Sequence, residues 1–275
     1  IVMAACYADG QDSTAVDISG WTTGANNYIK IYTPTETTEA GTSQRHNGTW
    51  DTTKYRLVTS TPYDYALNIA EGNVRVSGLQ LESTWASDNS QCIDVDVIDD
   101  LRIDGNIMRI VNNSSYSRCG ISAHGGGGGV ISSNGVIKVY NNIITEIGST
   151  DYASGLQFVC YESYNNPFTA IVYNNTVCNV DQTGIGFVGD ELVFYAYNNI
   201  MYNCGTDYVV DDITGGNAHT SNNATSDDTS PDGASFQNKN FLFEDAVNYN
   251  FHLSSSDTAA RNADRPARNG VLSEP

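Results

Sequence analysis

Positive charge is scarce in this sequence of 275 residues. Lys and Arg total 13 against 32 Asp and Glu, which gives a formal net charge of -19, and the basic residues lie scattered along the chain. A surface this acidic repels nucleic acid and anionic lipid, so we expect neither as a partner. An acidic polysaccharide could bind only through bridging cations such as Ca²⁺, or at a local basic pocket.

Long apolar segments are also missing. No run of 18 apolar residues exists, so no transmembrane span is predicted. The chain opens on Ile1-Val2-Met3 without a charged-then-apolar signal peptide, which we interpret as a processed or truncated start. Abundant Asn, Thr, Ser and Gly, together with 17 Tyr, are typical of an extracellular β protein. We therefore predict an extracellular or cell-surface location.

The six cysteines include no Cys-x-x-Cys pair, so zinc knuckles and thioredoxin-like redox motifs are unsupported. The cysteines lie beside core-type positions of the repeat described next, where a thiol packs as a small apolar group. Single burial and disulfides between neighbouring coils both remain open.

A repeated Tyr-Asn-Asn sequence organises the middle of the chain. Three clear copies begin at Tyr140, Tyr173 and Tyr197, and weaker copies extend the series in both directions. One unit occupies between 24 and 36 residues, a length that suits one coil of a β solenoid. The second turn residues of the six units are Leu79, Asn106, Asn142, Asn175, Asn199 and Asn223.

The Asn pair has a physical explanation in a stacked solenoid. Asn tolerates the left-handed backbone that a tight bend requires, and its amide can hydrogen-bond the same amide one coil away. Coils stack about 4.8 Å apart, the spacing between paired strands. The tyrosines beside the turn serve either cross-coil packing or an aromatic platform for sugars. The predicted Asn ladder consists of Asn106, Asn142, Asn175, Asn199 and Asn223.

A second motif, clearest as Gly-Ile-x-Phe, follows each Asn turn. Its copies are Cys92–Val95, Gly120–Ala123, Gly155–Phe158 and Gly184–Phe187. Period-two alternation directs the second and fourth residues inward, and another short strand directly follows each Asn turn. Each coil then carries three short strands. We predict an all-β fold, a right-handed parallel β-helix in one domain over 1–275, with first coils at 1–66, regular coils at 67–228, and a closing segment and irregular tail at 229–275.

The Tyr-Asn-Asn-Ile and Gly-Ile-x-Phe pieces resemble the repeats of the pectate-lyase-like class of parallel β-helix proteins, over roughly residues 67–228. Segments 28–35, 41–50 and 251–260 look like parts of uncharacterised exported bacterial proteins of this type. The resemblance implies a fold more than an activity, because the class includes polysaccharide lyases, glycoside hydrolases, tailspikes and adhesins. It also implies that ligands lie along the strand that carries the Gly-Ile-x-Phe motif, between the flanking loops; we call it the first strand in this subsection.

Two coils carry long loops after that first strand, one containing Gly125–Gly129 and one starting near Tyr161. The outward positions of the neighbouring strands predict a patch in which two carboxylates lie next to an imidazole, an arrangement suited to acid–base cleavage. The candidates are Asp94, Asp96 and His124 for catalysis, and Ser122, Gln157, Arg118 and Tyr161 for binding.

The same acidic run offers oxygen ligands for Ca²⁺, from Asp94, Asp96, Asp99 and Asp100. The simpler interpretation is an ordinary half-exposed strand, because Ile-Asp-Val-Asp alternates as any such strand does. His124 next to the glycines equally fits an exposed loop residue.

Three functions stay open at this point. The first is a structural surface protein, an adhesin or fibre-like subunit that assembles end to end with its own copies, since an uncapped solenoid end is an unpaired strand edge. The second is a polysaccharide lyase or glycoside hydrolase that acts along the first-strand groove. The third is a glycan-binding module that uses exposed Tyr and Trp85.

Overall fold

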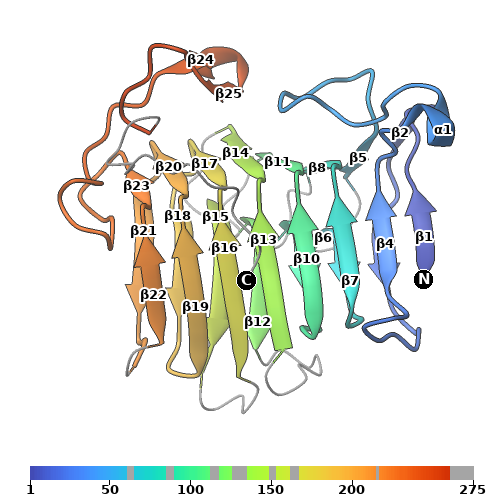
Figure 1. Ribbon diagram of the computed structural model, residues 1–275, viewed down its shortest axis with the longest axis horizontal. Coiled ribbons are helices and arrows are strands. Elements are labelled where there is room, and N and C mark those ends of the chain that lie inside the picture. The colour runs from blue at the N-terminus through green and yellow to red at the C-terminus, as the bar shows by residue number, and fades with distance from the viewer. Residues whose placement is uncertain are drawn as a thin grey trace.

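The computed structural model describes residues 1–60, 65–84, 90–111, 118–125, 135–148, 153–161, 167–214 and 217–260. These residues form a right-handed parallel β-helix, which confirms the predicted fold. Three parallel sheets run along the long axis, and each of the first seven coils contributes one strand to each sheet in the order A, B, C, while the last coil contributes strands to sheets A and B (Figure 1). Eight coils begin in sheet A, and we number them from the N-terminus.

The strands follow chain order within each sheet. Sheet A contains β1 (Val2–Ala5), β4 (Ile29–Tyr32), β7 (Val74–Ser77), β10 (Asp100–Asp104), β13 (Gly135–Tyr140), β16 (Phe168–Tyr173), β19 (Leu192–Tyr197) and β22 (Ala218–Ser221). Sheet B contains β2 (Gln11–Asp12), β5 (Arg56–Thr59), β8 (Gln80–Ser83), β11 (Ile107–Val111), β14 (Ile143–Ile147), β17 (Thr176–Cys178), β20 (Ile200–Tyr202) and β23 (Ala224–Thr225). Sheet C contains β3 (Val16–Ile18), β6 (Tyr65–Ile69), β9 (Ser90–Val95), β12 (Arg118–Gly125), β15 (Ala153–Cys160), β18 (Thr183–Val188) and β21 (Thr206–Asp211).

The core lies inside the coils and is lined by alternate residues of all three sheets. Phe187 stacks on Phe158 of the preceding coil with ring centroids 5.2 Å apart, and on Phe194 with centroids 4.0 Å apart. Both contacts join side chains that are less than 2% exposed. The second and fourth positions of the Gly-Ile-x-Phe motif therefore face inward, as the alternation predicts.

The glycine of that motif is required by a close approach between coils. A Cβ atom on Gly155 would lie 2.5 Å from the carbonyl oxygen of Gly184, and one on Gly120 would lie 2.6 Å from that of Gly155. No side chain fits there without moving the neighbouring backbone. In coil 7 the equivalent residue is Asp207, whose carboxylate accepts hydrogen bonds from the backbone N–H groups of Ser226 and Asp227.

The two residues of the Asn turn have different structural roles. The first takes the left-handed backbone, with φ of 57° at both Asn141 and Asn174. The second forms the ladder: Asn142 Nδ2 donates to Asn175 Oδ1 at 3.0 Å and also to the backbone carbonyl of Ile103 at 3.0 Å. The same pattern repeats at each rung, so the predicted ladder is confirmed and its buried amides are satisfied.

The ladder has two different ends. At its start the backbone N–H of Leu79 donates to Asn106 Oδ1 at 2.9 Å. At its end Asn223 Nδ2 donates to Asp232 Oδ2 at 2.9 Å. Asp232 is an acceptor with no donor of its own when ionised, so it terminates the series.

The tyrosine column packs across coils. The rings of Tyr140 and Tyr173 lie 4.8 Å apart with an interplanar angle of 1°. The ring faces that are turned to each other are therefore covered by the stack. Of the two sequence-based interpretations, the structure shows cross-coil packing for this pair.

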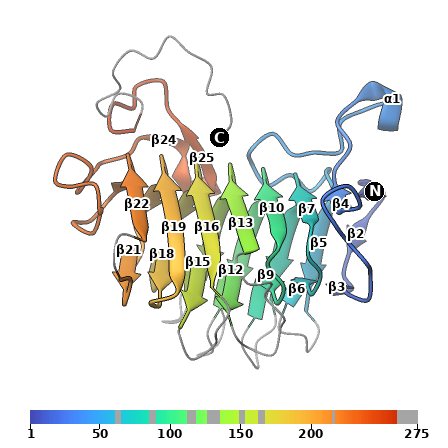
Figure 2. The ribbon, with the colours of Figure 1, turned by 60° about the horizontal axis from the view of Figure 1, so that its bottom comes forward.

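The polypeptide outside the three sheets lies mainly beside sheet B. It includes a short helix, α1 (Thr37–Ala40), and an antiparallel hairpin of β24 (Phe243–Asp245) and β25 (Asn250–Leu253), joined by the 3₁₀ helix η2 (Ala246–Asn248). Figures 1 and 2 show the hairpin standing off the sheet A and C strands. Phe243 contacts Tyr202 of sheet B edge-on at 5.3 Å.

The six cysteines, which all lie in described residues, are present as thiols. Four are buried, in agreement with single burial as small apolar groups. No helix in the described part of the chain is long and apolar enough to cross a membrane.

Candidate functional site

The predicted patch lies on the outward face of sheet C, across coils 3 to 5. Parallel register places Asp94 of β9 opposite Ser122 of β12, and Ser122 opposite Gln157 of β15. These three residues therefore lie in one column along the axis, as the sequence pattern predicts. Ser122 is 3% exposed, so this outward face is covered there.

His124 joins the same patch from the end of β12, where it is exposed. Partial burial of the imidazole removes hydration from its charged form and lowers the pKa of His124 below its ordinary value, while a hydrogen bond to Gln157 acts in the opposite direction. The lowered pKa favours the neutral imidazole, which is the form that can accept a proton.

Cys119 completes the patch and was missed by the sequence analysis. Its Sγ lies 3.4 Å from Gln157 Oε1, and burial followed by the charge of Asp94 raises the pKa of the thiol to about 12. The thiol is thus a weak donor and no nucleophile. Its position before the Gly-Ile motif was the available signal. We call Asp94, Cys119, Ser122, His124 and Gln157 the sheet C cluster.

Asp96 bonds away from this cluster, toward coils 1 and 2. Asn68 Nδ2 donates to Asp96 Oδ2 at 3.0 Å and to Asp17 Oδ1 at 3.2 Å. One buried amide thus bridges two carboxylates on either side of its coil. Asn68 was also missed, although it shares the register column of Asp94.

The four aspartates offered for calcium do not converge. Asp99 accepts a hydrogen bond from Asn73 Nδ2 at 2.7 Å. Asp100 forms ion pairs with Arg75 and Arg102 on sheet A. Across the described residues no group of three or more His, Cys, Asp or Glu is arranged to hold a metal ion. The geometry therefore assembles no Ca²⁺ site from these aspartates.

Arg118 is fully buried, with 0% exposure, instead of flanking the patch. Burial lowers the pKa of Arg118, and the neighbouring Cys92 and Glu146 side chains act in the opposite direction. Glu146 is itself 3% exposed and accepts a hydrogen bond from the backbone N–H of Asp181 at 2.7 Å. Arg118 therefore belongs to a buried charge network and is not presented to a ligand.

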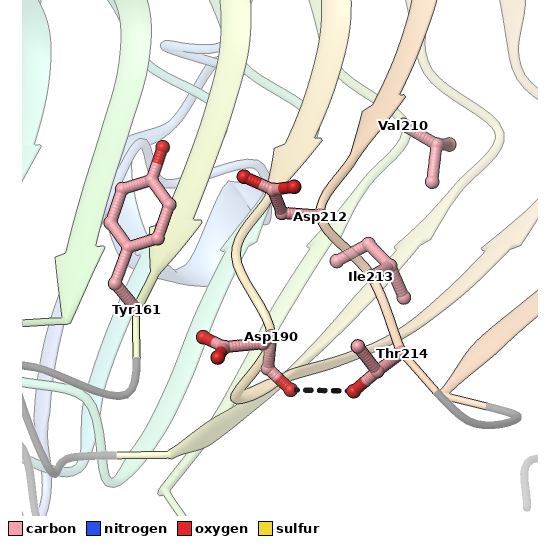
Figure 3. A pocket seen from close by; sticks show the side chains of 6 residues that line it. All are labelled: Tyr161, Asp190, Val210, Asp212, Ile213 and Thr214. Carbon is pink, nitrogen blue, oxygen red and sulfur yellow. Dashed lines mark hydrogen bonds between the residues drawn. The ribbon is translucent and has the colours of Figure 1, made fainter.

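Tyr161 follows β15 and lines an open pocket of about 510 Å³ at the turn from sheet C to sheet A. Figure 3 shows the carboxylates of Asp190 and Asp212 pointing toward the side of the pocket that Tyr161 occupies. Thr214 Oγ1 donates to the Asp190 carbonyl at 3.4 Å and closes the base of the pocket. The remaining lining residues are Val210 and Ile213.

Trp85 and Gly126–Gly129 lie outside the described residues.

Comparison with known proteins adds no further constraint: no family model, no curated protein and no solved structure matches this chain.

Proposed function

We propose that this protein is an extracellular or cell-surface β-helical rod of the adhesin or fibre type, with a binding and structural role instead of a catalytic one. The resemblance to the pectate-lyase-like class belongs to this proposal as a likeness of scaffold. What supports it most is how the polar side chains are engaged: three of the aspartates offered for catalysis or metal binding bond to other residues of the chain. These bonds are Asp96 to Asn68 and Asp99 to Asn73 of the preceding coils, and Asp100 to Arg75 of the preceding coil and to Arg102 of its own strand.

Such bonds stiffen a solenoid because each coil contacts only its neighbours. The Asn ladder adds a continuous buried chain of amides, and a second pair at the turn from sheet B to sheet C joins Asn203 Nδ2 to Asn179 Oδ1 at 2.9 Å. A rod that transmits force or holds a ligand at a distance needs this coupling. A catalytic groove needs instead carboxylates that are released toward a substrate.

Assembly of copies through coil 1 is part of the proposal. This coil exposes apolar side chains, with Ile1 62%, Met3 54% and Trp21 54% exposed. At the other end of the solenoid, Asp232 accepts a hydrogen bond from Asn223, and Asp207 accepts one from the backbone N–H of Ser226. The apolar coil 1 surfaces of two copies can therefore pair with each other, which joins two rods end to end in a two-fold dimer.

Sedimentation velocity tests this assembly. A concentration-dependent dimer that disappears in Met3→Glu/Trp21→Glu, but persists in the matched exposed variant Leu242→Glu/Val247→Glu, is expected. A monodisperse monomer at high concentration would falsify the assembly.

Turnover of polysaccharides tests the non-catalytic role. The chain is incubated with neutral and acidic polysaccharides, with and without Ca²⁺, and the release of reducing ends is measured. We expect no release on any substrate. Release that is lost in both His124→Ala and Asp94→Asn would replace this proposal with an enzyme.

That enzyme is the second candidate, and one observation favours it. A neutral imidazole at His124 lies in the same cluster as the Asp94 carboxylate, so a base and an acidic group occupy neighbouring coils. The Gln157 contact would orient the ring. Polysaccharide cleavage along sheet C is the reaction that this cluster could support.

A further inference from the structure

The second half of β21 is an open strand edge at the C-terminal end of sheet C. Sheets A and B each contain eight strands, whereas sheet C contains seven and ends at β21 (Figure 2). After β23 the chain passes the start of β21, where the backbone N–H of Tyr208 donates to Thr229 Oγ1 at 2.9 Å. It then turns back toward sheet B, where the backbone N–H of Lys239 donates to the Thr225 carbonyl at 2.8 Å. Within the described ranges, no strand pairs with β21 on its C-terminal side.

The side chain of Val210 shows that the core is open at this edge. Val210 pairs in register with Phe187, and Phe187 pairs with Phe158, so all three occupy the same inward position on successive coils. The two phenylalanines are 0% exposed, whereas Val210 is 42% exposed. Tyr208, the inward residue just before Val210 on β21, is 4% exposed. The last coil therefore covers the core as far as Tyr208 and leaves it open at Val210.

The backbone of Val210 also points away from the sheet. The N–H of Gly189 donates to the Asp211 carbonyl at 3.0 Å, so the backbone of Asp211 faces the preceding coil. In a parallel sheet the backbone groups of successive residues face opposite neighbours, so those of Val210 point past the end of sheet C, as the Tyr208 N–H does. An edge of this kind, next to an exposed inward position, is a template for an added strand.

Acidic side chains surround the open edge. Val210 and Asp212 line the pocket that Tyr161 also lines, and Asp190 faces the same space (Figure 3). Asp211 and Asp212 are both exposed. A second copy of this edge would bring the same negative charges, and the whole chain carries a net charge of -19, so pairing of two such edges is opposed. A segment with basic side chains is attracted instead.

We propose that the second half of β21 docks an extended basic segment of a partner protein as an added strand of sheet C. An apolar side chain of that segment covers Val210, as each coil covers the coil before it. The alternate side chains of the segment are Lys or Arg and meet Asp211 and Asp212. Main-chain hydrogen bonds to Val210 contribute affinity, and the charges select the partner. The site lies at the opposite end of the solenoid from coil 1, so it is independent of the assembly proposed there.

Fluorescence anisotropy with the full chain and a labelled peptide, Lys-Val-Lys-Val-Lys-Val-Lys, tests the strand pairing. We expect a Kd on the order of 10 to 100 μM, because the open edge is short. Val210→Pro removes the N–H that points out of the sheet and leaves the pairing of β21 with β18 in place, so we expect about tenfold weaker binding. Val210→Ile keeps both the N–H and the apolar side chain, and it is expected to retain the affinity.

The role of charge is tested by a second pair of variants. Asp211→Asn/Asp212→Asn is expected to weaken binding of the same peptide about tenfold, because both carboxylates that attract it are neutralised. Asp9→Asn/Glu36→Gln makes the same change of net charge at exposed positions near the other end of the solenoid, and it is expected to retain the affinity. Thermal unfolding of all four variants checks that each is folded.

Several results overturn the proposal. These are equal affinity for the peptide with N-methyl groups on its three central residues, equal affinity for Glu-Val-Glu-Val-Glu-Val-Glu, or equal loss of affinity in both acidic double variants. Peptide binding that appears only after removal of residues 261–275 would assign the edge to the chain's own C-terminal segment. A dimer that persists in Met3→Glu/Trp21→Glu but disappears in Val210→Pro would assign the edge to a second copy.

Discussion

The outward faces of sheets A and C are built by the same coils but use their polar side chains differently. On sheet C, Asn68 and Ser122 are 7% and 3% exposed, and Asn68 bridges neighbouring coils. On sheet A, Arg102 is 39% exposed and its charge reaches solvent. The comparison teaches that both faces of a solenoid can couple its coils, one through buried amide and hydroxyl groups and the other through charged groups that stay partly exposed.

The largest effect is expected from filling the closest approach on sheet C. Gly155→Val places a side chain against the backbone of Gly184, so we expect the free energy of unfolding to fall by about 3 kcal/mol. Gly186→Ala is the control, because its Cβ would meet nothing closer than 3.4 Å. Urea unfolding measures both, and equal stability of the two variants would contradict the close packing of coils.

The next effect concerns the ladder at the turn between sheets A and B. Asn175→Ala removes the acceptor of Asn142, leaving a buried amide without its partner, at a cost of about 2 to 3 kcal/mol. Urea unfolding measures the effect, and Asn240→Ala, a substitution at an exposed position, is expected to leave the midpoint of the unfolding transition unchanged. If the two midpoints coincide, the ladder contributes nothing to stability.

A direct comparison of the two faces comes from Asn68→Ala and Arg102→Gln. The first breaks two buried cross-coil hydrogen bonds and is expected to cost about 1 to 2 kcal/mol. The second removes one exposed ion pair, with an expected cost below about 0.5 kcal/mol. Thermal unfolding measures the loss of stability in each variant. A larger loss in Arg102→Gln than in Asn68→Ala would contradict the stronger coupling of coils on sheet C.

The smallest effect is a pH dependence at His124. Partial burial lowers the pKa of His124 in the folded state. The folded chain therefore binds this proton less readily than the unfolded chain, in which the pKa of the histidine is near 6.5. The stability contribution is full above that value and is lost as the pH falls through the lowered pKa. Nuclear magnetic resonance titration should show a midpoint below 6.5, and His124→Gln should flatten this part of the stability curve. A titration midpoint above 6.5 would contradict the lowering of the His124 pKa by burial.

The coil architecture could be predicted because its signals are local. An Asn-Asn turn and a period-two strand are visible within a few residues, and stacking then forces the amides of Asn142 and Asn175 together. The column of Asp94, Ser122 and Gln157 could be predicted for the same reason, since the Gly-Ile-x-Phe motif fixes their register.

Pairing between coils of unequal length could not be predicted. The number of residues per coil varies, so nothing in the sequence aligns Lys30 with Arg75, and the basic residues looked scattered until register brought them together. The burial of Arg118 was missed because the period-two alternation does not continue N-terminal to Gly120: Cys119 contacts the outward Gln157, and Arg118 is buried. The partner of Asp96 depended on Asn68, which lies in a coil without a clear copy of the repeat.

The direction of the Asn ladder has an electrostatic consequence. Every side-chain amide donates toward the C-terminal coils, so the amide dipoles add along the axis, with their positive ends toward Asp232. A carboxylate at that end is stabilised in the way that an acidic residue is at the N-terminus of an α-helix. The interior of the rod is thus electrically polarised, and successive amides strengthen one another's hydrogen bonds.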